Sequence, residues 1–212
     1  MADTACNFAL SSTFNAKYDI TWSFQFSLCG YPGCHGGFAT FLYDADVPQL
    51  IGGGIRSSLG FAKYEELTLL GSTRYPGVSG SIVGAGFDSS GLFSSRQYGL
   101  VTGAQNSVPN SYAVRVGDEF TAVGYGVLPF SVMSQQDAYT AMRFNLTDMG
   151  QTLNIDYKEN IASPFSRIAS IDTGLLYIED TYCNIGISFA SPTSGDLGAV
   201  FKIKNIHTHG VS

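Results

Sequence analysis

Hydrophobic and polar residues alternate along much of this chain. In residues 19–28, every second residue from Ile20 to Leu28 is apolar, and the positions between them carry Thr, Ser or Gln. Successive side chains of a β-strand point to opposite faces of a sheet, so this period of two predicts a strand with one buried face. Similar patterns predict further strands at residues 37–43, 81–87, 111–116, 140–146, 152–157, 183–189 and 199–206.

The segments between these strands are rich in Gly, Ser, Pro and Asn, as in residues 191–196. Helix signals are few: residues 134–141 begin with a serine that suits a helix N-cap, but we expect a short turn that leads into a strand. Many strands joined by such loops predict an all-β sandwich or barrel. No linker, charge block or repeat divides the chain, so we expect one domain over residues 1–212.

Charge and hydropathy exclude two classes of partner. Eleven Lys and Arg against 17 Asp and Glu give a net charge of -6, so no basic field attracts a phosphate backbone and we expect no nucleic-acid partner. No apolar run reaches the ~20 residues that span a bilayer, so we expect no membrane insertion. The first six residues also lack the basic and apolar segments of a secretory signal.

Four cysteines occur, at Cys6, Cys29, Cys34 and Cys183, without the paired spacing of a zinc site. Cys29 and Cys34 flank a Gly-Tyr-Pro-Gly segment that reads as a tight turn, which would let the two face each other across a hairpin. The sequence leaves two readings open for this pair, a disulfide or two half-buried free thiols.

Catalytic motifs are absent from the sequence. There is no G-x-S-x-G elbow or H-E-x-x-H helix, and the adjacent acids at Glu65 and Glu66 would point to opposite faces of a strand. Asp44 and Asp46 have alternate spacing, but they lie where a predicted strand ends. We therefore expect a non-enzymatic protein, with a β-sandwich glycoside hydrolase as the least favoured alternative.

The three histidines give weak signals. His207 and His209 would share one face of the last strand and chelate a metal if a third ligand arrived from elsewhere. An exposed pair near the chain end is the reading that we favour. His35 stands at the entrance to a predicted strand, where loops often carry function.

Several glycine-bearing segments, read in order, resemble the legume or L-type lectin-like family. They are H-G-G-F-A-T-F-L-Y-D at 35–44, G-G-G-I-R-S-S-L-G-F-A at 52–62, G-V-S-G-S-I-V-G-A-G-F-D at 77–88, P-N-S-Y-A-V-R-V-G at 109–117, L-T-D-M-G-Q-T-L-N-I-D-Y-K at 146–158 and N-I-G-I-S-F-A-S-P-T-S-G from 184. The resemblance covers nearly the whole chain. It implies a concanavalin A-like jelly-roll sandwich of two antiparallel sheets, with the first and last strands adjacent. That adjacency would bring Cys6 near Cys183 and make a second disulfide plausible.

The resemblance also implies a sugar site that uses an aspartate, a backbone amide of the glycine loop and an asparagine held by calcium. In the family, metal ions are held around an E-F-D motif at the end of a strand. The sequence departs from this pattern, because Gly86 stands in place of the glutamate and Asp88 is the one carboxylate of the motif that remains. Hard cations need several oxygen ligands, so we expect that the usual calcium ligands are lost and that there is no metal site. The loops that could still bind a ligand contain His35, Gly53, Gly54, Asp88 and Arg96, with Tyr31, Tyr98 or Phe93 to stack on a sugar ring.

Two functions follow from this resemblance. Similar domains occur in phage and virus structural proteins, which predicts a virion-associated decoration or appendage protein on a virion or extracellular surface. Its partners would be other virion structural proteins or further copies of itself, and also glycans of the host surface. The alternative is a secreted carbohydrate-binding lectin.

Overall fold

The alternation in the sequence predicts most of the strands in the computed structural model of this chain. The structure describes residues 5–29, 35–50, 52–54, 58–68, 71–95, 107–117, 121–134, 138–160, 162–175, 181–190 and 199–210. Each of the eight predicted strands is present, with ends displaced by no more than three residues. The strands of the described residues are β1 (Ala5–Asn15), β2 (Ile20–Cys29), β3 (Gly37–Asp44), β4 (Tyr64–Thr68), β5 (Gly71–Tyr75), β6 (Ser81–Asp88), β7 (Ser111–Val116), β8 (Ala122–Val127), β9 (Thr140–Thr147), β10 (Thr152–Lys158), β11 (Ser166–Asp172), β12 (Tyr182–Ala190) and β13 (Val200–His209).

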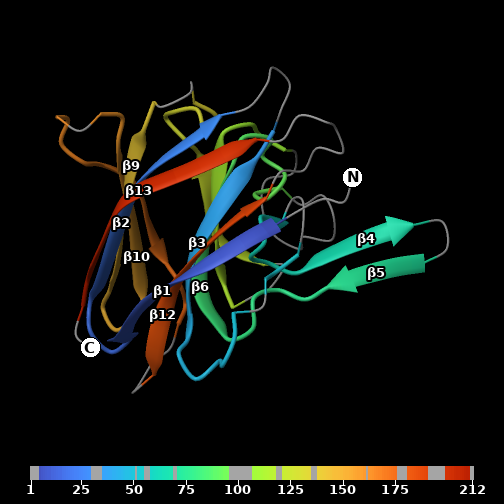
Figure 1. Ribbon diagram of the computed structural model, residues 1–212, viewed down its shortest axis with the longest axis horizontal. Coiled ribbons are helices and arrows are strands. Elements are labelled where there is room, and N and C mark those ends of the chain that lie inside the picture. The colour runs from blue at the N-terminus through green and yellow to red at the C-terminus, as the bar shows by residue number, and fades with distance from the viewer. Residues whose placement is uncertain are drawn as a thin grey trace.

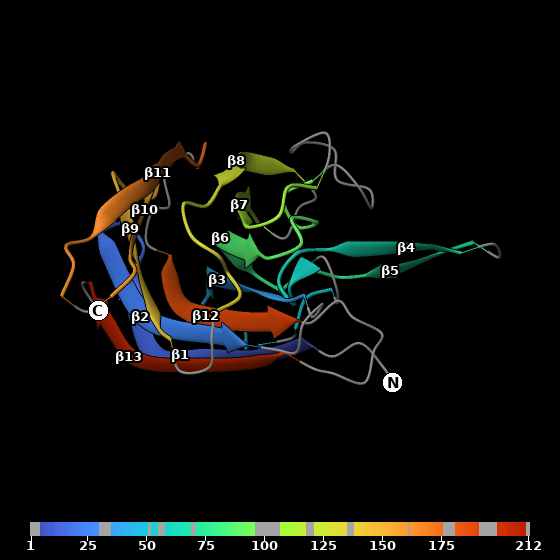
Figure 2. The ribbon, with the colours of Figure 1, turned by 90° about the horizontal axis from the view of Figure 1, so that it is seen from above.

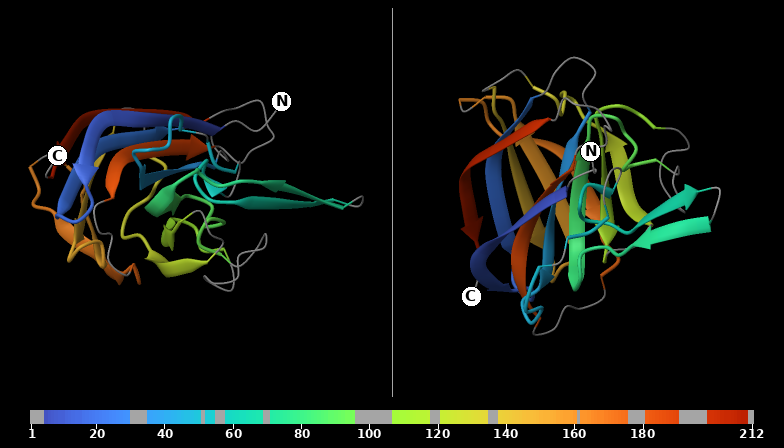
Figure 3. Two further views of the ribbon diagram at one scale, coloured as in Figure 1. Left: turned by 90° about the horizontal axis from the view of Figure 1, so that it is seen from below. Right: turned by 45° about the vertical axis from the view of Figure 1, so that its right-hand side comes forward.

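Two antiparallel sheets form a sandwich (Figure 1). Sheet A has six strands in the order β1-β12-β3-β6-β7-β8, and sheet B has five in the order β11-β10-β9-β2-β13. Figure 2 shows the sheets curving over one another, with β8 and β11 at neighbouring edges. The remaining pair, β4 and β5, projects from the sandwich as an arm that stands out in both views of Figure 3. The predicted all-β sandwich is confirmed.

The main hydrophobic core lies between the two sheets. The inward residues of β2 are the ones that the alternation predicts, from Ile20 to Leu28, and all are buried. The Trp22 ring stacks on Phe144 of the same sheet at 5.2 Å between ring centroids. Its indole N–H reaches across to the other sheet and donates to Thr40 Oγ1 at 2.9 Å. A buried indole needs such a partner, so this bond joins the two sheets at a defined position.

A second hydrophobic cluster covers the face of sheet A that points away from sheet B. Gly84 and Gly86 of β6 form part of its floor, and the rings of Phe61 and Phe93 rest on them. A Cβ added at Gly86 would lie 2.3 Å from Phe93 Cε1, and one added at Gly84 would lie 2.4 Å from Phe61 Cζ. The glycines of β6 are therefore required by close packing of the chain's own aromatic rings.

The pairing of the terminal strands differs from the expectation. β1 pairs with β12 in sheet A, whereas β13 pairs with β2 in sheet B. The predicted Cys6–Cys183 disulfide is wrong, because Cys6 lies opposite Phe189 while Cys183 lies opposite Phe14. Six residues of extended strand separate these positions by about 20 Å, and a disulfide needs Cα atoms within about 7 Å.

The described cysteines are free thiols, at Cys6, Cys29 and Cys183. Of the two alternatives for Cys29, a disulfide or a free thiol, the structure therefore shows the free thiol. Cys34 lies outside the described residues. Among the residues that the structure describes, no helix is long and apolar enough to cross a membrane.

Candidate functional site

Asp88, at the end of β6, fastens the loop that follows it. Its side chain is buried, with 1% of the residue surface exposed. The backbone N–H and the hydroxyl of Ser90 both donate to Oδ1 at 2.8 Å, and the Phe93 backbone N–H donates to Oδ2 at 3.0 Å. Both carboxylate oxygens thus accept hydrogen bonds from the chain's own loop, as buried carboxylates require.

This arrangement does not fit the calcium site that the fold family implies. A hard cation needs several oxygen ligands at once, but the Asp88 oxygens already hold donors, and the Phe93 ring lies over Gly86. Within the described ranges, no group of three or more His, Cys, Asp or Glu residues is placed to hold a metal ion.

The two glycines proposed to present amides to a sugar use those amides internally. Gly53 N–H donates to the Gly60 carbonyl at 2.8 Å, and Gly54 N–H donates to the Ala62 carbonyl at 2.9 Å. A Cβ at Gly53 would lie 2.3 Å from the Phe61 carbonyl oxygen. These glycines allow a close approach between segments of the chain, and their amides donate to its own carbonyls.

Phe93 also cannot stack on a sugar, because its ring is fully buried. The guanidinium of Arg115 lies over the ring, 4.6 Å from the centroid, and its Nη2 donates to the Phe93 carbonyl at 2.5 Å. Burial lowers the pKa of Arg115 to about 10. The stacking role predicted for Phe93 is therefore wrong, and the residue acts as an internal plug.

His35 is exposed and lies at the same end of the sandwich as Asp88. The next residue, Gly36, donates its N–H to Ser89 Oγ at 3.0 Å, and Ser89 N–H returns a bond to the Gly36 carbonyl at 3.1 Å. The structure therefore brings the His35 and Asp88 segments together. The other predicted contact residues lie outside the described residues and stay predictions: Arg96, Tyr31 and Tyr98.

The carboxylates considered for a glycosidase also have a local role. Asp44 Oδ1 accepts a hydrogen bond at 2.9 Å from the backbone N–H of Asp46, in the turn after β3. Asp and Asn side chains commonly stabilise turns in this way.

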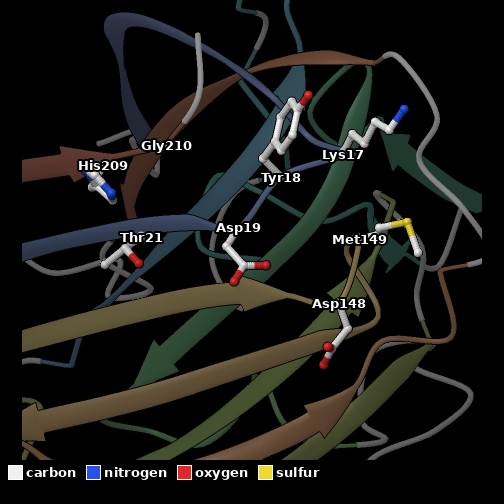
Figure 4. A pocket seen from close by; sticks show the side chains of 8 residues that line it. All are labelled: Lys17, Tyr18, Asp19, Thr21, Asp148, Met149, His209 and Gly210. Atoms are coloured by element: carbon white, nitrogen blue, oxygen red, sulfur yellow. The ribbon is translucent and has the colours of Figure 1, made fainter.

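An open pocket of about 680 Å³ lies at the other end of the sandwich (Figure 4). Three segments of sheet B meet there: the turn before β2, the turn between β9 and β10, and the end of β13. The pocket is far from Asp88: Thr21 of the pocket and Leu28, which lies beside Gly36 near Asp88, are seven residues apart along β2, or roughly 20 Å. The residues that line the pocket are Lys17, Tyr18, Asp19, Thr21, Asp148, Met149, His209 and Gly210. We refer to it as the Tyr18 pocket.

A hydrogen-bond network on the outer face of sheet B supports one wall of the Tyr18 pocket. Thr21 Oγ1 donates to Asn145 Oδ1 at 2.9 Å, and Asn145 Nδ2 donates to Asp156 Oδ2 at 3.2 Å. Asp156 is buried, and it also accepts from Arg143 Nη2 at 2.9 Å and from Arg167 Nε. A carboxylate held by several donors fixes its partners in one geometry.

The Tyr18 pocket is hard to predict from the sequence. The sequence marked His209 only as one of two histidines on a strand face, and it did not single out Tyr18, Asp19 or Met149. These residues come from two separate turns and a strand end, so only the pairing of β2 with β9 and β13 brings them together.

Comparisons with known proteins give a likeness in structure alone. No family model matches the chain, and no curated protein matches it in sequence. Lectin II from Ulex europaeus is similar with a TM-score of 0.63 at 11% identity, over 98% of this chain and 82% of that one. A lectin from Bauhinia forficata, solved with GalNAc, gives 0.58 at 14% identity, over 100% and 82%.

The potassium-bound carbohydrate recognition domain of Emp46p gives a TM-score of 0.57 at 11% identity, over 99% of this chain and 80% of that chain. These likenesses extend over almost every described strand. The chain therefore has the legume or L-type lectin-like fold, a concanavalin A-like sandwich of two antiparallel sheets.

Proposed function

We propose that this protein is a non-enzymatic, lectin-like protein that binds glycans without a bound metal ion. One observation carries the proposal: the chain matches carbohydrate-binding lectins over nearly its whole length, while its own hydrogen bonds occupy the Asp88 carboxylate. The hydrogen bonds from Ser90 and Phe93 to Asp88 hold the loop after β6 in one conformation, which a bound cation would otherwise do. Glycan binding is then independent of calcium.

A glycan array tests this function directly. The protein is applied once with calcium and once with EDTA, and it should bind the same glycans with equal signal in both conditions. Loss of all signal in EDTA would show that a metal site operates, and an absence of binding to every glycan would reject the function. Hydrolysis of a bound polysaccharide would favour the glycosidase alternative.

A structural role on a virion or extracellular surface is the second part of the proposal. The exposed apolar residues of β8 favour self-association or contact with other structural proteins: Val123, Tyr125 and Val127 alternate along this edge strand and are 40%, 50% and 63% exposed. Edge strands usually carry charge or bulges that prevent such pairing. β8 has no charged residue, and its register shift against β7 is confined to the start of the strand, between Ala122 and Gly124. A secreted lectin is the alternative, and a protein that stays monomeric at high concentration in sedimentation would favour it.

A further inference from the structure

We propose that the Tyr18 pocket is a binding site for a neutral sugar residue, distinct from the end of the fold that holds Asp88. This inference rests on the proposed glycan-binding function and gives it a location. The pocket's volume of about 680 Å³ falls within the usual range of small-molecule sites, roughly 300–1,000 Å³.

Two exposed side chains supply the apolar part of the pocket. Tyr18 is 46% exposed and Met149 is 37% exposed, and both line the same cavity. The C–H face of a sugar ring packs on an aromatic ring, and a tyrosine offers its hydroxyl as a further hydrogen-bonding group. A thioether adapts its shape to irregular ligands.

The backbone at Met149 gives a second reason to assign a ligand. Gly150 N–H donates to the Thr147 carbonyl at 3.1 Å, and the two residues between them, Asp148 and Met149, have φ of 55° and 53°. A β-turn with positive φ at both central residues favours Gly, Asn or Asp at these positions. Methionine in the second position strains the backbone and exposes an apolar side chain. Residues with such strained backbones cluster at ligand-binding and active sites.

Polar groups around these two residues determine which sugar fits. In the view of Figure 4, Asp19 lies between Tyr18 and Asp148, with His209 to one side. Carboxylates accept hydrogen bonds from sugar hydroxyls, and the Lys17 ammonium donates them. Two carboxylates against one ammonium give the pocket an excess of negative charge, which disfavours sialylated, uronic or sulfated sugars. A neutral hexose fits this balance.

The pocket is also preformed. Tyr18 N–H donates to the Asn15 carbonyl at 3.2 Å, and Lys17 N–H donates to Asn15 Oδ1 at 2.9 Å. On the other side, Gln151 N–H donates to the Asp148 carbonyl at 3.2 Å. A ligand therefore meets turns that already hold their bound shape, which lowers the entropy lost on binding.

Methionine-methyl NMR with the whole protein provides the test. The probes are the methyl glycosides of galactose, glucose, mannose and N-acetylglucosamine, with N-acetylneuraminic acid as the anionic comparison. The chain has four methionines, and the spectrum of Met149→Gly assigns the Met149 signal. At least one neutral glycoside should shift this signal in a saturable manner, and N-acetylneuraminic acid should bind more weakly.

Three variants separate a ligand site from a structural turn. Tyr18→Ala should weaken binding by about tenfold, the effect of losing one stacking contact worth about 1.4 kcal/mol, whereas Tyr18→Phe should retain most of it. Met149→Gly should weaken binding while raising the urea midpoint, because glycine relieves the strained turn. Tyr75→Ala, which removes a partly exposed tyrosine from the β4–β5 arm, away from the pocket lining, is the matched control and should bind like wild type.

The outcomes distinguish this site from the function on which it rests. Wild-type affinity in Tyr18→Ala and Met149→Gly, with glycan binding intact, would overturn the Tyr18 pocket and leave the lectin function standing. The pocket would also be rejected if glycosides shifted only the other methionine signals. If the wild-type protein bound neither the probes nor any arrayed glycan, both proposals would fail.

Discussion

Replacement of Asp88 tests whether its carboxylate fastens the loop after β6. In Asp88→Ala, three donors lose their acceptor: the backbone N–H and the hydroxyl of Ser90, and the backbone N–H of Phe93. These donors remain beside a side-chain position with 1% exposure. Each hydrogen bond to a charged group contributes about 1.5–3 kcal/mol, and bonds to one acceptor are not additive. The free energy of unfolding should therefore fall by about 4 kcal/mol.

Asp88→Asn should have a smaller effect. Its amide oxygen continues to accept the bonds from Ser90, but the amide N–H₂ faces the Phe93 N–H, a donor that then lacks an acceptor. We expect a loss of about 2 kcal/mol. Asp46→Ala, at an exposed turn position, is the matched control and should change stability by less than about 0.5 kcal/mol.

Urea denaturation followed by Trp22 fluorescence measures these differences, because the chain has one tryptophan and it is buried in the main core. The series is repeated with calcium and with EDTA. A cation present at 100 times its dissociation constant would add about 2.7 kcal/mol to the wild type. The reasoning is refuted if Asp88→Ala loses less than about 1 kcal/mol, or if calcium stabilises the wild type and not this variant.

Three further substitutions test other parts of the structure. Gly86→Ala should cost about 2 kcal/mol in urea denaturation, because the new Cβ would meet the buried ring of Phe93; an unchanged midpoint would show that the ring moves freely. Burial and the charge of Asp44 raise the pKa of Cys183 from 9.0 to about 12, so the folded state favours the neutral thiol, and its stability should fall as the pH rises from about 9 towards 12. Cys183→Ala should remove this part of the alkaline loss, and equal slopes in the two proteins would contradict the assignment. Val127→Lys should abolish any self-association seen in sedimentation, since it places a charge on an uncharged edge strand; undiminished association would exclude β8 as the interface.

The strands that the sequence predicts well are those in which apolar side chains alternate strictly with polar ones and face the core. β2 follows strict alternation, and its apolar residues face the core. β8 was not predicted because its pattern is inverted: Val123 and Tyr125 face solvent, while Gly124 faces inward against Ile171. β1 was missed as well, since a register shift between Ala9 and Thr13 interrupts its alternation.

The role of Asp88 was harder to predict, because an aspartate can either bind a metal ion or accept hydrogen bonds from its own loop. An aspartate at the end of β6 is compatible with metal binding or with loop fastening, and the sequence does not show which donors reach it. The choice depends on the backbone N–H of Phe93, five residues away, which the fold of the loop turns towards Asp88. The Tyr18 pocket was invisible for a related reason, since strand pairing alone assembles it.

The packing on the outer face of sheet A depends on the single ring of Phe93. Gly86 and Ala113 leave space on sheet A, and this ring from the same chain fills it. Truncation of the side chain would leave a buried, mostly apolar cavity beside Arg115. Such a cavity lowers stability, so the backbone N–H of Phe93 orders the loop after β6 while its ring holds that loop against the sheet.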